Sequence, residues 1–409
     1  MGPRLVKPGS PGLRPAAPEP RRFLVLSATM GAGHDAVAAA LAGRLTAAGH
    51  QVTRADVLDL LPAGLGRVIC SFYHATIRHL PALYAGIYQV FFRDGAEPRP
   101  AGTPLAALAA DGLLALTARC RPDVVVSVFH LAAQVAGRLR VRGALEVPSA
   151  VVVTDFAVHR QWLHPGSDLH LCLTAPIAEQ VARSVGRPAV ACGPLVDERF
   201  TMSPPPRHAA RWRERLAGGD RPVILLSTGA WGAATRVGQT VRLLAGAGYR
   251  PVVLCGENER LRHDLSAFPG AAVLGWIDDL PGLMGAADVL IDNAAGQTAL
   301  QGLAAGLPVV GYRPIPGHGA EGVKRMADLG LTDYARGPGA LLRSLAALSA
   351  RGPYRRQRIA AGRGLFDAGT DGVACLESLA GLRRDLPRRA AGDAARPGRP
   401  ADPRPGRTR

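Results

Sequence analysis

Residues 23–35 read FLVLSATMGAGHD: an apolar run, a turn with two glycines, and a histidine at the start of an alanine-rich stretch that continues to Ala48. The apolar run predicts a buried strand, and the pattern after it predicts a helix over 35–48. A helix that begins after glycines offers unpaired N–H groups and the positive end of its dipole to an anion. The turn lacks the third glycine of a dinucleotide-binding motif and the lysine of a P-loop, which disfavours NAD and ATP.

The same unit of strand, turn and helix recurs along the chain. Further strands are predicted at 123–128, 150–154, 169–173 and 189–192, and then at 222–227, 251–255, 271–274, 289–292 and 308–312. Strands that alternate with helices form parallel sheets with ligands at the carboxyl ends of the strands. The sequence therefore predicts an α/β protein of two doubly wound, Rossmann-like domains that face a central cleft.

Composition shifts place the expected boundaries. We expect a disordered N-terminal tail (1–22), a first domain (23–202), a linker opened by SPPP at 203–206 (203–221), a second domain (222–350), C-terminal helices (351–383) and a disordered basic tail (384–409). The tails are rich in Pro, Arg and Ala and lack periodic apolar residues, which is typical of disorder.

The net charge of +17 over 409 residues resembles that of a nucleic-acid-binding protein. Residues 1–22 carry +4 and residues 383–409 carry +6, however, which leaves only +7 for the body. We therefore expect no nucleic-acid partner. No apolar run reaches the roughly 18 residues of a membrane-spanning helix, and the N-terminus has no signal sequence, which predicts a cytoplasmic protein. The six cysteines lack pair spacing, which predicts free thiols and no metal site.

Two turns in the second half repeat the arrangement of the first. One is STGAWG at 227–232, and the other is DNAAGQT at 292–298, which opens a helix that Gly306 closes. Two helix starts at one sheet edge can both face a diphosphate. Gly229, Gly296, Gln297 and Thr298 are therefore candidate donor-binding residues, although each turn alone is also common architecture.

Polar and aromatic residues follow two other strands. Trp276 and Ile277 lie in GWIDD at 275–279, where an aromatic side chain and exposed backbone groups suit a nucleobase. The aspartates of that stretch are better suited to cap a helix than to bind a metal. In TDFAVHRQW at 154–162, Asp155 and His159 directly follow a strand, where a carboxylate can orient an imidazole.

Residues 70–94 hold six of the sixteen Phe and Tyr residues, among them Tyr73, Tyr84 and Tyr88, interleaved with Arg and His. An amphipathic aromatic and basic segment can lie at a lipid interface. An ordinary core helix explains the same pattern, so the residues alone leave both interpretations open.

In this order the motifs resemble the GT-B glycosyltransferases of the monogalactosyldiacylglycerol synthase and processive diacylglycerol glucosyltransferase group, over about residues 22–380. More distantly, the chain is similar to the enzyme that adds N-acetylglucosamine to the lipid-linked peptidoglycan precursor. The motifs that carry the resemblance are the GAGH turn at 31–34, LPALY at 80–84, the motif at 154–162, residues 275–284, residues 296–308, and Pro316-Gly317-His318.

The resemblance implies a UDP-sugar-dependent hexosyltransferase, inverting and independent of metal or other cofactor, that acts on a membrane lipid, with diacylglycerol as the expected acceptor. It implies a catalytic base at His34, with Asp155 or His159 as its partner or replacement. The donor would contact Gly229, Trp276, Ile277, Gly296, Gln297, Thr298, Gln301, Gly317 and His318. The acceptor would contact Gly31, Gly33, Tyr73, Tyr84 and Tyr88. The implied location is the cytoplasmic face of the cell membrane, where the protein would bind an anionic surface peripherally.

The chain departs from the family pattern at two donor positions. Gln301 stands where the family usually has a ribose-binding Glu, and Pro316-Gly317-His318-Gly319 replaces a sugar-reading Pro-Gly-Gln-Glu. A neutral Gln forms weaker hydrogen bonds than a carboxylate. Three other functions therefore remain open: a UDP-sugar epimerase of similar fold, a transferase with a soluble acceptor, and a catalytically silent binding protein.

Overall fold

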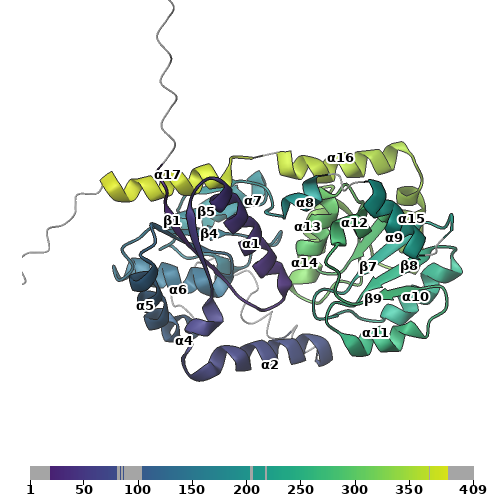
Figure 1. Ribbon diagram of the computed structural model, residues 1–409, viewed down its shortest axis with the longest axis horizontal. Helices are drawn as coiled ribbons and strands as arrows, with labels where there is room; N and C mark the ends of the chain where they lie inside the picture. Colours follow the sequence, from purple (N-terminus) through teal and green to yellow (C-terminus); the bar gives the residue numbers. More distant parts are fainter. Residues whose placement is uncertain are drawn as a thin grey trace, which may run out of the picture.

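The structure, a computed structural model, describes residues 19–80, 83, 86, 104–202, 206–216, 219–367 and 369–385. It has two six-stranded parallel sheets in two lobes that lie side by side (Figure 1). In spatial order the first sheet is β2 (Gln51–Asp56), β1 (Arg22–Ser27), β3 (Val124–Ser127), β4 (Ser149–Val152), β5 (Leu169–Cys172) and β6 (Ala189–Ala191). The second is β12 (Thr332–Ala335), β11 (Val309–Tyr312), β10 (Val289–Asp292), β7 (Val223–Ser227), β8 (Arg250–Leu254) and β9 (Ala272–Leu274). The prediction of two doubly wound sheets is confirmed.

Helices cover both faces of each sheet. Those of the first lobe are α1 (Ala32–Ala47), α2 (Leu65–His79), α4 (Pro104–Leu108), α5 (Ala110–Cys120), α6 (His130–Val141) and α7 (Ala175–Val185), with short 3-10 helices η1 (Val57–Leu60), η2 (Pro62–Gly64) and η3 (Arg160–Trp162). The later helices are α8 (Glu198–Thr201), α9 (Pro206–Leu216), α10 (Val237–Gly246), α11 (Glu259–Ser266), α12 (Leu280–Ala286), α13 (Gln297–Ala304), α14 (His318–Asp328), α15 (Pro338–Ser349), α16 (Pro353–Asp367) and α17 (Gly372–Asp385).

The core consists of apolar layers on both sides of each sheet, and one layer continues from lobe to lobe. In the first lobe this layer includes Val151 and Trp162, and in the second it includes Leu225, Ala299 and Leu303. Because these side chains form one buried cluster, the lobes share a dry contact behind the cavity that is described below.

Two segments placed outside the predicted domains pack in specific positions. The predicted linker contains α9, which buries Trp212 and Leu216 in the core shared by the lobes. Trp212 also donates from Nε1 to Asp279 Oδ2 at 3.0 Å. The C-terminal helices α16 and α17 run across the top of the molecule, α16 over the second lobe and α17 over the first (Figure 1).

Helix α17 completes the core of the first lobe. Its Leu376, Leu379 and Ala380 are buried in one cluster with Phe23 and Val126 of the first sheet. His50, next to β2, places Nε2 2.7 Å from Glu377 Oε1 of α17. The last described helix is thus part of the lobe that the first strand begins.

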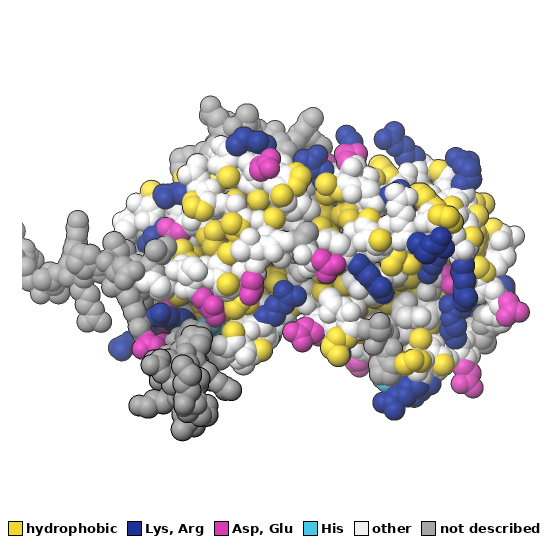
Figure 2. Space-filling view, turned by 90° about the horizontal axis from the view of Figure 1, so that it is seen from above, with side chains coloured by type: hydrophobic (Ala, Val, Ile, Leu, Met, Phe, Trp, Pro, Cys, Tyr) yellow, Lys and Arg dark blue, Asp and Glu magenta, His cyan; other side chains and the backbone are white. Residues whose placement is uncertain are grey.

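Several sequence-based expectations concern residues outside this description. The predicted disordered tails fall almost entirely in 1–18 and 386–409, and Tyr84 and Tyr88 also lie outside the described residues. Within the described residues, no helix combines the length and hydropathy needed to cross a bilayer. All six cysteines are free thiols, as predicted. On the face seen in Figure 2, basic side chains are spread over both lobes among acidic ones rather than joined into one patch.

Two core histidines of the first lobe make stability depend on pH. His164 and His170 are buried, and burial lowers the pKa of each to about 4. Below the unfolded value near 6.5, the unfolded chain binds protons that the folded chain does not. We therefore expect the free energy of unfolding to fall between pH 6.5 and about 4, by up to about 1.4 kcal/mol per pH unit for each histidine.

Urea denaturation at pH 7.5, 6.5, 5.5 and 4.5 measures this slope. The variant His170→Leu removes one of the contributing groups and should flatten the slope without abolishing it, since burial also lowers the pKa of other histidines. Equal stability of the wild-type chain at pH 6.5 and 4.5 would contradict the expectation.

Candidate active site

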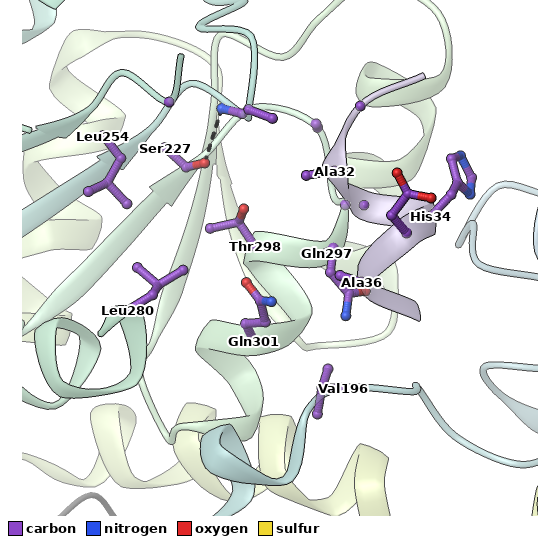
Figure 3. A pocket seen from close by; sticks show the side chains of 18 of the residues that line it. Ala32, His34, Ala36, Val196, Ser227, Leu254, Leu280, Gln297, Thr298 and Gln301 are labelled. Atoms are coloured by element: carbon purple, nitrogen blue, oxygen red, sulfur yellow. Dashed lines mark hydrogen bonds between the residues drawn. The ribbon is translucent and has the colours of Figure 1, made fainter. Parts of the chain in front are cut away.

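A cavity of about 920 Å³ lies between the lobes, at the carboxyl ends of strands from both sheets. One face of α1, from its first turn to Ala47, forms its wall on the first lobe together with Tyr73 and Ile77 of α2. The loops after β7, β8, β9 and β10 form the opposite wall, together with the start of α13. Figure 3 shows Ala32 and Ala36 of α1 next to Gln297 of α13, with the His34 side chain on the side of α1 away from Thr298 and Gln301. A volume of this size fits a ligand as large as a nucleotide sugar.

The start of α1 positions His34. Gly31 caps the helix at φ +108°, a backbone conformation that favours glycine. Ser27, at the end of β1, donates from Oγ to Asp35 Oδ1 at 2.6 Å and ties the first turn to the sheet. His34 places Nδ1 3.0 Å from the carbonyl oxygen of Val128. Because a carbonyl only accepts, Nδ1 carries the proton and Nε2 has the free lone pair.

Burial lowers the pKa of His34 below 6.5, and the charge of Asp155 is the first of the effects that oppose this shift. The imidazole is therefore neutral at pH 7. Asp155 in turn accepts a hydrogen bond from Trp162 Nε1 at 2.8 Å, and its Oδ2 lies 3.5 Å from His159 Nε2. Burial also lowers the pKa of His159 well below 6.5.

Asp155 and His159 thus lie together after β4, as the sequence predicts, but the lining of the cavity does not include them. Asp155 acts on His34 through charge from behind the cavity wall. This position suits a partner of His34 better than a replacement for it, because neither side chain lines the space that a ligand would occupy.

Sequence analysis assigned no role to the rings that surround His34. Phe129 packs edge-on to the His34 ring at 4.9 Å, and Trp162 lies 6.1 Å from it. His130 stacks against Phe129 at 4.1 Å, and burial lowers its pKa to about 3. These residues follow β3 and β4, the next strands in the sheet after β1. A His directly after an apolar run, as at Val128-Phe129-His130, was the available signal.

The loop after β7 forms part of the opposite wall, and Gly229 lies in it as predicted. Gly229 and Gly232 have φ of +72° and +65°, which gives the loop its tight turns. The backbone N–H of Glu257 donates to the carbonyl of Ala230 at 2.7 Å. Gly256 packs against the same carbonyl so closely that an added Cβ would lie 2.1 Å from it.

Helix α13 brings four predicted donor residues to the wall: Gly296, Gln297, Thr298 and Gln301. The turn before it is built on buried Asp292, which accepts hydrogen bonds from the N–H groups of Ala294 and Ala295. One residue has an additional role: Gln297 donates from Nε2 to the carbonyl of Leu195 at 3.0 Å. Its amide nitrogen therefore ties α13 to the segment that joins the lobes.

Of the remaining predicted residues, some line the cavity and others lie outside its lining. Trp276, 57% exposed, lines the cavity with Ile277 and His318. Asp279 caps α12 through the N–H of Gly282, as predicted, whereas Asp278 lines the cavity. Gly317 is the N-cap of α14 and is outside the lining.

Of the residues predicted to contact the acceptor, Gly31, Gly33 and Tyr73 line the cavity. The wall also includes Val196–Phe200 and Arg44, which sequence analysis did not select. Among the described residues, no three His, Cys, Asp or Glu side chains are arranged to hold a metal ion.

Two doubly wound lobes with a cavity between the carboxyl ends of their strands define the GT-B fold. Solved structures agree with this assignment. The chain is similar to the glycotransferase of kitacinnamycin, at 17% identity over 90% of this chain and all of that chain, with a TM-score of 0.58. It is also similar to Anabaena HepE, solved in complex with UDP and glucose, at 12% identity over 90% of this chain and all of that chain, with a TM-score of 0.53.

Within this fold, a family model described as monogalactosyldiacylglycerol (MGDG) synthase matches residues 34–189. The processive diacylglycerol beta-glucosyltransferase of Bacillus subtilis is 25% identical over 51% of this chain and 56% of its own length. That of Bacillus licheniformis is 24% identical over 58% of this chain and 62% of its own length. The chain thus spans little more than half of these relatives. The matches confirm the resemblance to the monogalactosyldiacylglycerol synthase and processive diacylglycerol glucosyltransferase group.

Proposed function

We propose that the protein transfers a hexose from a UDP-sugar to a hydroxyl of a membrane lipid, with diacylglycerol as the acceptor and with inversion at the anomeric carbon. The observation that carries this proposal is the position of a neutral imidazole, His34, in the same cavity as the glycine turns and helix start of the other lobe. The relatives named above supply the acceptor class.

In the proposed reaction, the acceptor oxygen attacks the anomeric carbon while the bond from that carbon to the diphosphate oxygen breaks. His34 Nε2 takes the hydroxyl proton, and UDP leaves with the bonding electron pair. A single displacement of this kind inverts the configuration. Asp155 stabilises the imidazolium that forms, because its carboxylate is held by Trp162 and acts on the His34 ring.

The second lobe would bind the donor. The start of α13 and the loop 228–232 would receive the diphosphate, because N–H groups at a helix start favour negative charge. Trp276 and Ile277 would contact the uracil, and Gln301 the ribose. Since these groups provide the stabilisation, the proposed reaction needs no metal. His318 replaces a sugar-reading Gln of the family, so the donor hexose stays open.

The acceptor would enter beside α2. This helix exposes Val68 (64%) and Phe72 (56%), one helical turn apart, with Leu80 and Leu83 also exposed beyond its end. An apolar helix face of this kind suits the interfacial region of a bilayer. We propose peripheral attachment to the cytoplasmic face of the membrane through this surface, with Tyr73 of the same helix in the cavity wall.

The test is to supply radiolabelled UDP-sugars, one at a time, with total membrane lipid or with purified diacylglycerol in detergent micelles. Label in the organic phase with inverted anomeric configuration supports the proposal. Conversion of the UDP-sugar without any acceptor would identify an epimerase instead. Label recovered only on water-soluble compounds would replace the lipid by a soluble acceptor.

The pH dependence of the reaction tests the role of Asp155. The carboxylate of Asp155 raises the pKa of His34, so Asp155→Asn should lower that pKa further. The acid limb of kcat/KM, which lies below pH 6.5 in the wild-type enzyme, should then move to lower pH, and kcat should fall by about tenfold or more. Rate profiles from pH 4.5 to 8.5 measure both effects. A limb that moves to higher pH would contradict the assignment.

A further inference from the structure

Trp231 lies in the loop that follows β7, and two of its neighbours in the loop are hydrogen-bonded within the second lobe. Ala230 accepts from the backbone of Glu257, and the Asn293 side chain donates to the carbonyl of Ala233 at 2.9 Å. The half-buried Trp231 ring extends from this loop toward the first lobe.

The ring meets two consecutive residues of α2. It lies 4.7 Å from the His74 ring, tilted by 34°, and 5.8 Å from the Tyr73 ring in an edge-on arrangement at 70°. Trp231 and Tyr73 both line the cavity. In Figure 1, α2 runs along the lower edge of the first lobe toward the second lobe. A cluster of three rings from two lobes therefore lies at one side of the cavity.

We propose that this ring cluster positions the loop 228–232 for a diphosphate, so that the acceptor-side helix α2 helps set the affinity of the donor site. The inference rests on the proposed function. A loop held in its binding conformation loses less conformational freedom when a ligand binds. Trp231 is thus a positioning residue that acts through the backbone of its neighbours, and Tyr73 and His74 hold its ring.

A double-mutant cycle with UDP as the probe tests this inference by calorimetry. Trp231→Ala and His74→Ala should each weaken UDP binding by about fivefold, on the scale of one buried aromatic pair. The double variant should bind no more weakly than the weaker single variant, because both changes break one contact. Trp231→Phe, which keeps a ring, should restore most of the affinity.

Ser71→Ala, an exposed change on the same helix, is the matched control and should leave UDP affinity within twofold of the wild type. In turnover assays, Trp231→Ala should raise the donor KM and leave kcat at saturating donor nearly unchanged. Wild-type UDP affinity in His74→Ala, or additive losses in the double variant, would overturn the inference while the proposed function stands. A wild-type chain that does not bind UDP would overturn both.

Discussion

Replacing His34 with alanine is expected to lower turnover by about a hundredfold or more, while the affinity for UDP changes by less than about threefold. The side chain supplies the proposed base, and its Nδ1 is already paired with Val128, so Nε2 alone faces the proton transfer. The diphosphate would be held by the other lobe, which keeps its glycine turns and the start of α13. The measurements are kcat with a lipid acceptor and a UDP titration.

Two further variants make the result specific to proton transfer. His34→Gln keeps a side-chain amide that can donate to Val128 but supplies no base, so it should be as slow as the alanine variant. His263→Ala removes an exposed histidine of α11 and should leave turnover unchanged. Normal turnover in His34→Ala would remove this residue from the mechanism.

Adding one methyl group at position 256 should weaken binding of the donor by the second lobe. In Gly256→Ala the new Cβ would lie 2.1 Å from the carbonyl oxygen of Ala230, and φ is +57° there. The loop 228–232 must shift, because a backbone carbonyl cannot move aside as easily as the end of a flexible side chain. We expect UDP affinity to fall at least about tenfold and the free energy of unfolding to fall by about 1–3 kcal/mol.

Gly246→Ala provides the comparison, since this glycine ends α10 with no atom near its added Cβ. That variant should keep its UDP affinity and gain up to about 1 kcal/mol of stability. Calorimetry with UDP and urea denaturation separate the two readouts. Wild-type UDP binding by Gly256→Ala would show that the loop tolerates the displacement.

The interior strands were predictable because apolar runs such as 123–128 leave few alternatives to burial in a parallel sheet. The edge strands β2 and β12 were not predicted, because neither is marked by a long apolar run. Residues 51–56 read QVTRAD and are half-exposed, so no apolar run marks them. Their strand conformation depends on pairing with β1 and β11, which local sequence does not encode.

The same distinction holds for the site: residues in local motifs were predictable, and contacts between distant segments were not. His34, Gly229 and Gly296 follow strands within local motifs, and the cavity contains all three. The contact of Gln297 with Leu195 and that of Trp231 with α2 join segments more than a hundred residues apart. Such contacts follow from how the lobes dock, which no local motif encodes.

The return of α17 to the first sheet has a consequence for synthesis on the ribosome. The apolar layer that begins with Phe23 is incomplete until Leu376 and Leu379 arrive from the far end of the chain. At about 5–20 residues per second, synthesis of the intervening chain takes roughly 20–70 s, and this apolar layer stays incomplete for that time. During that interval the nascent first lobe exposes an apolar surface. A chain released before α17 would keep it, which makes premature termination a route to aggregation.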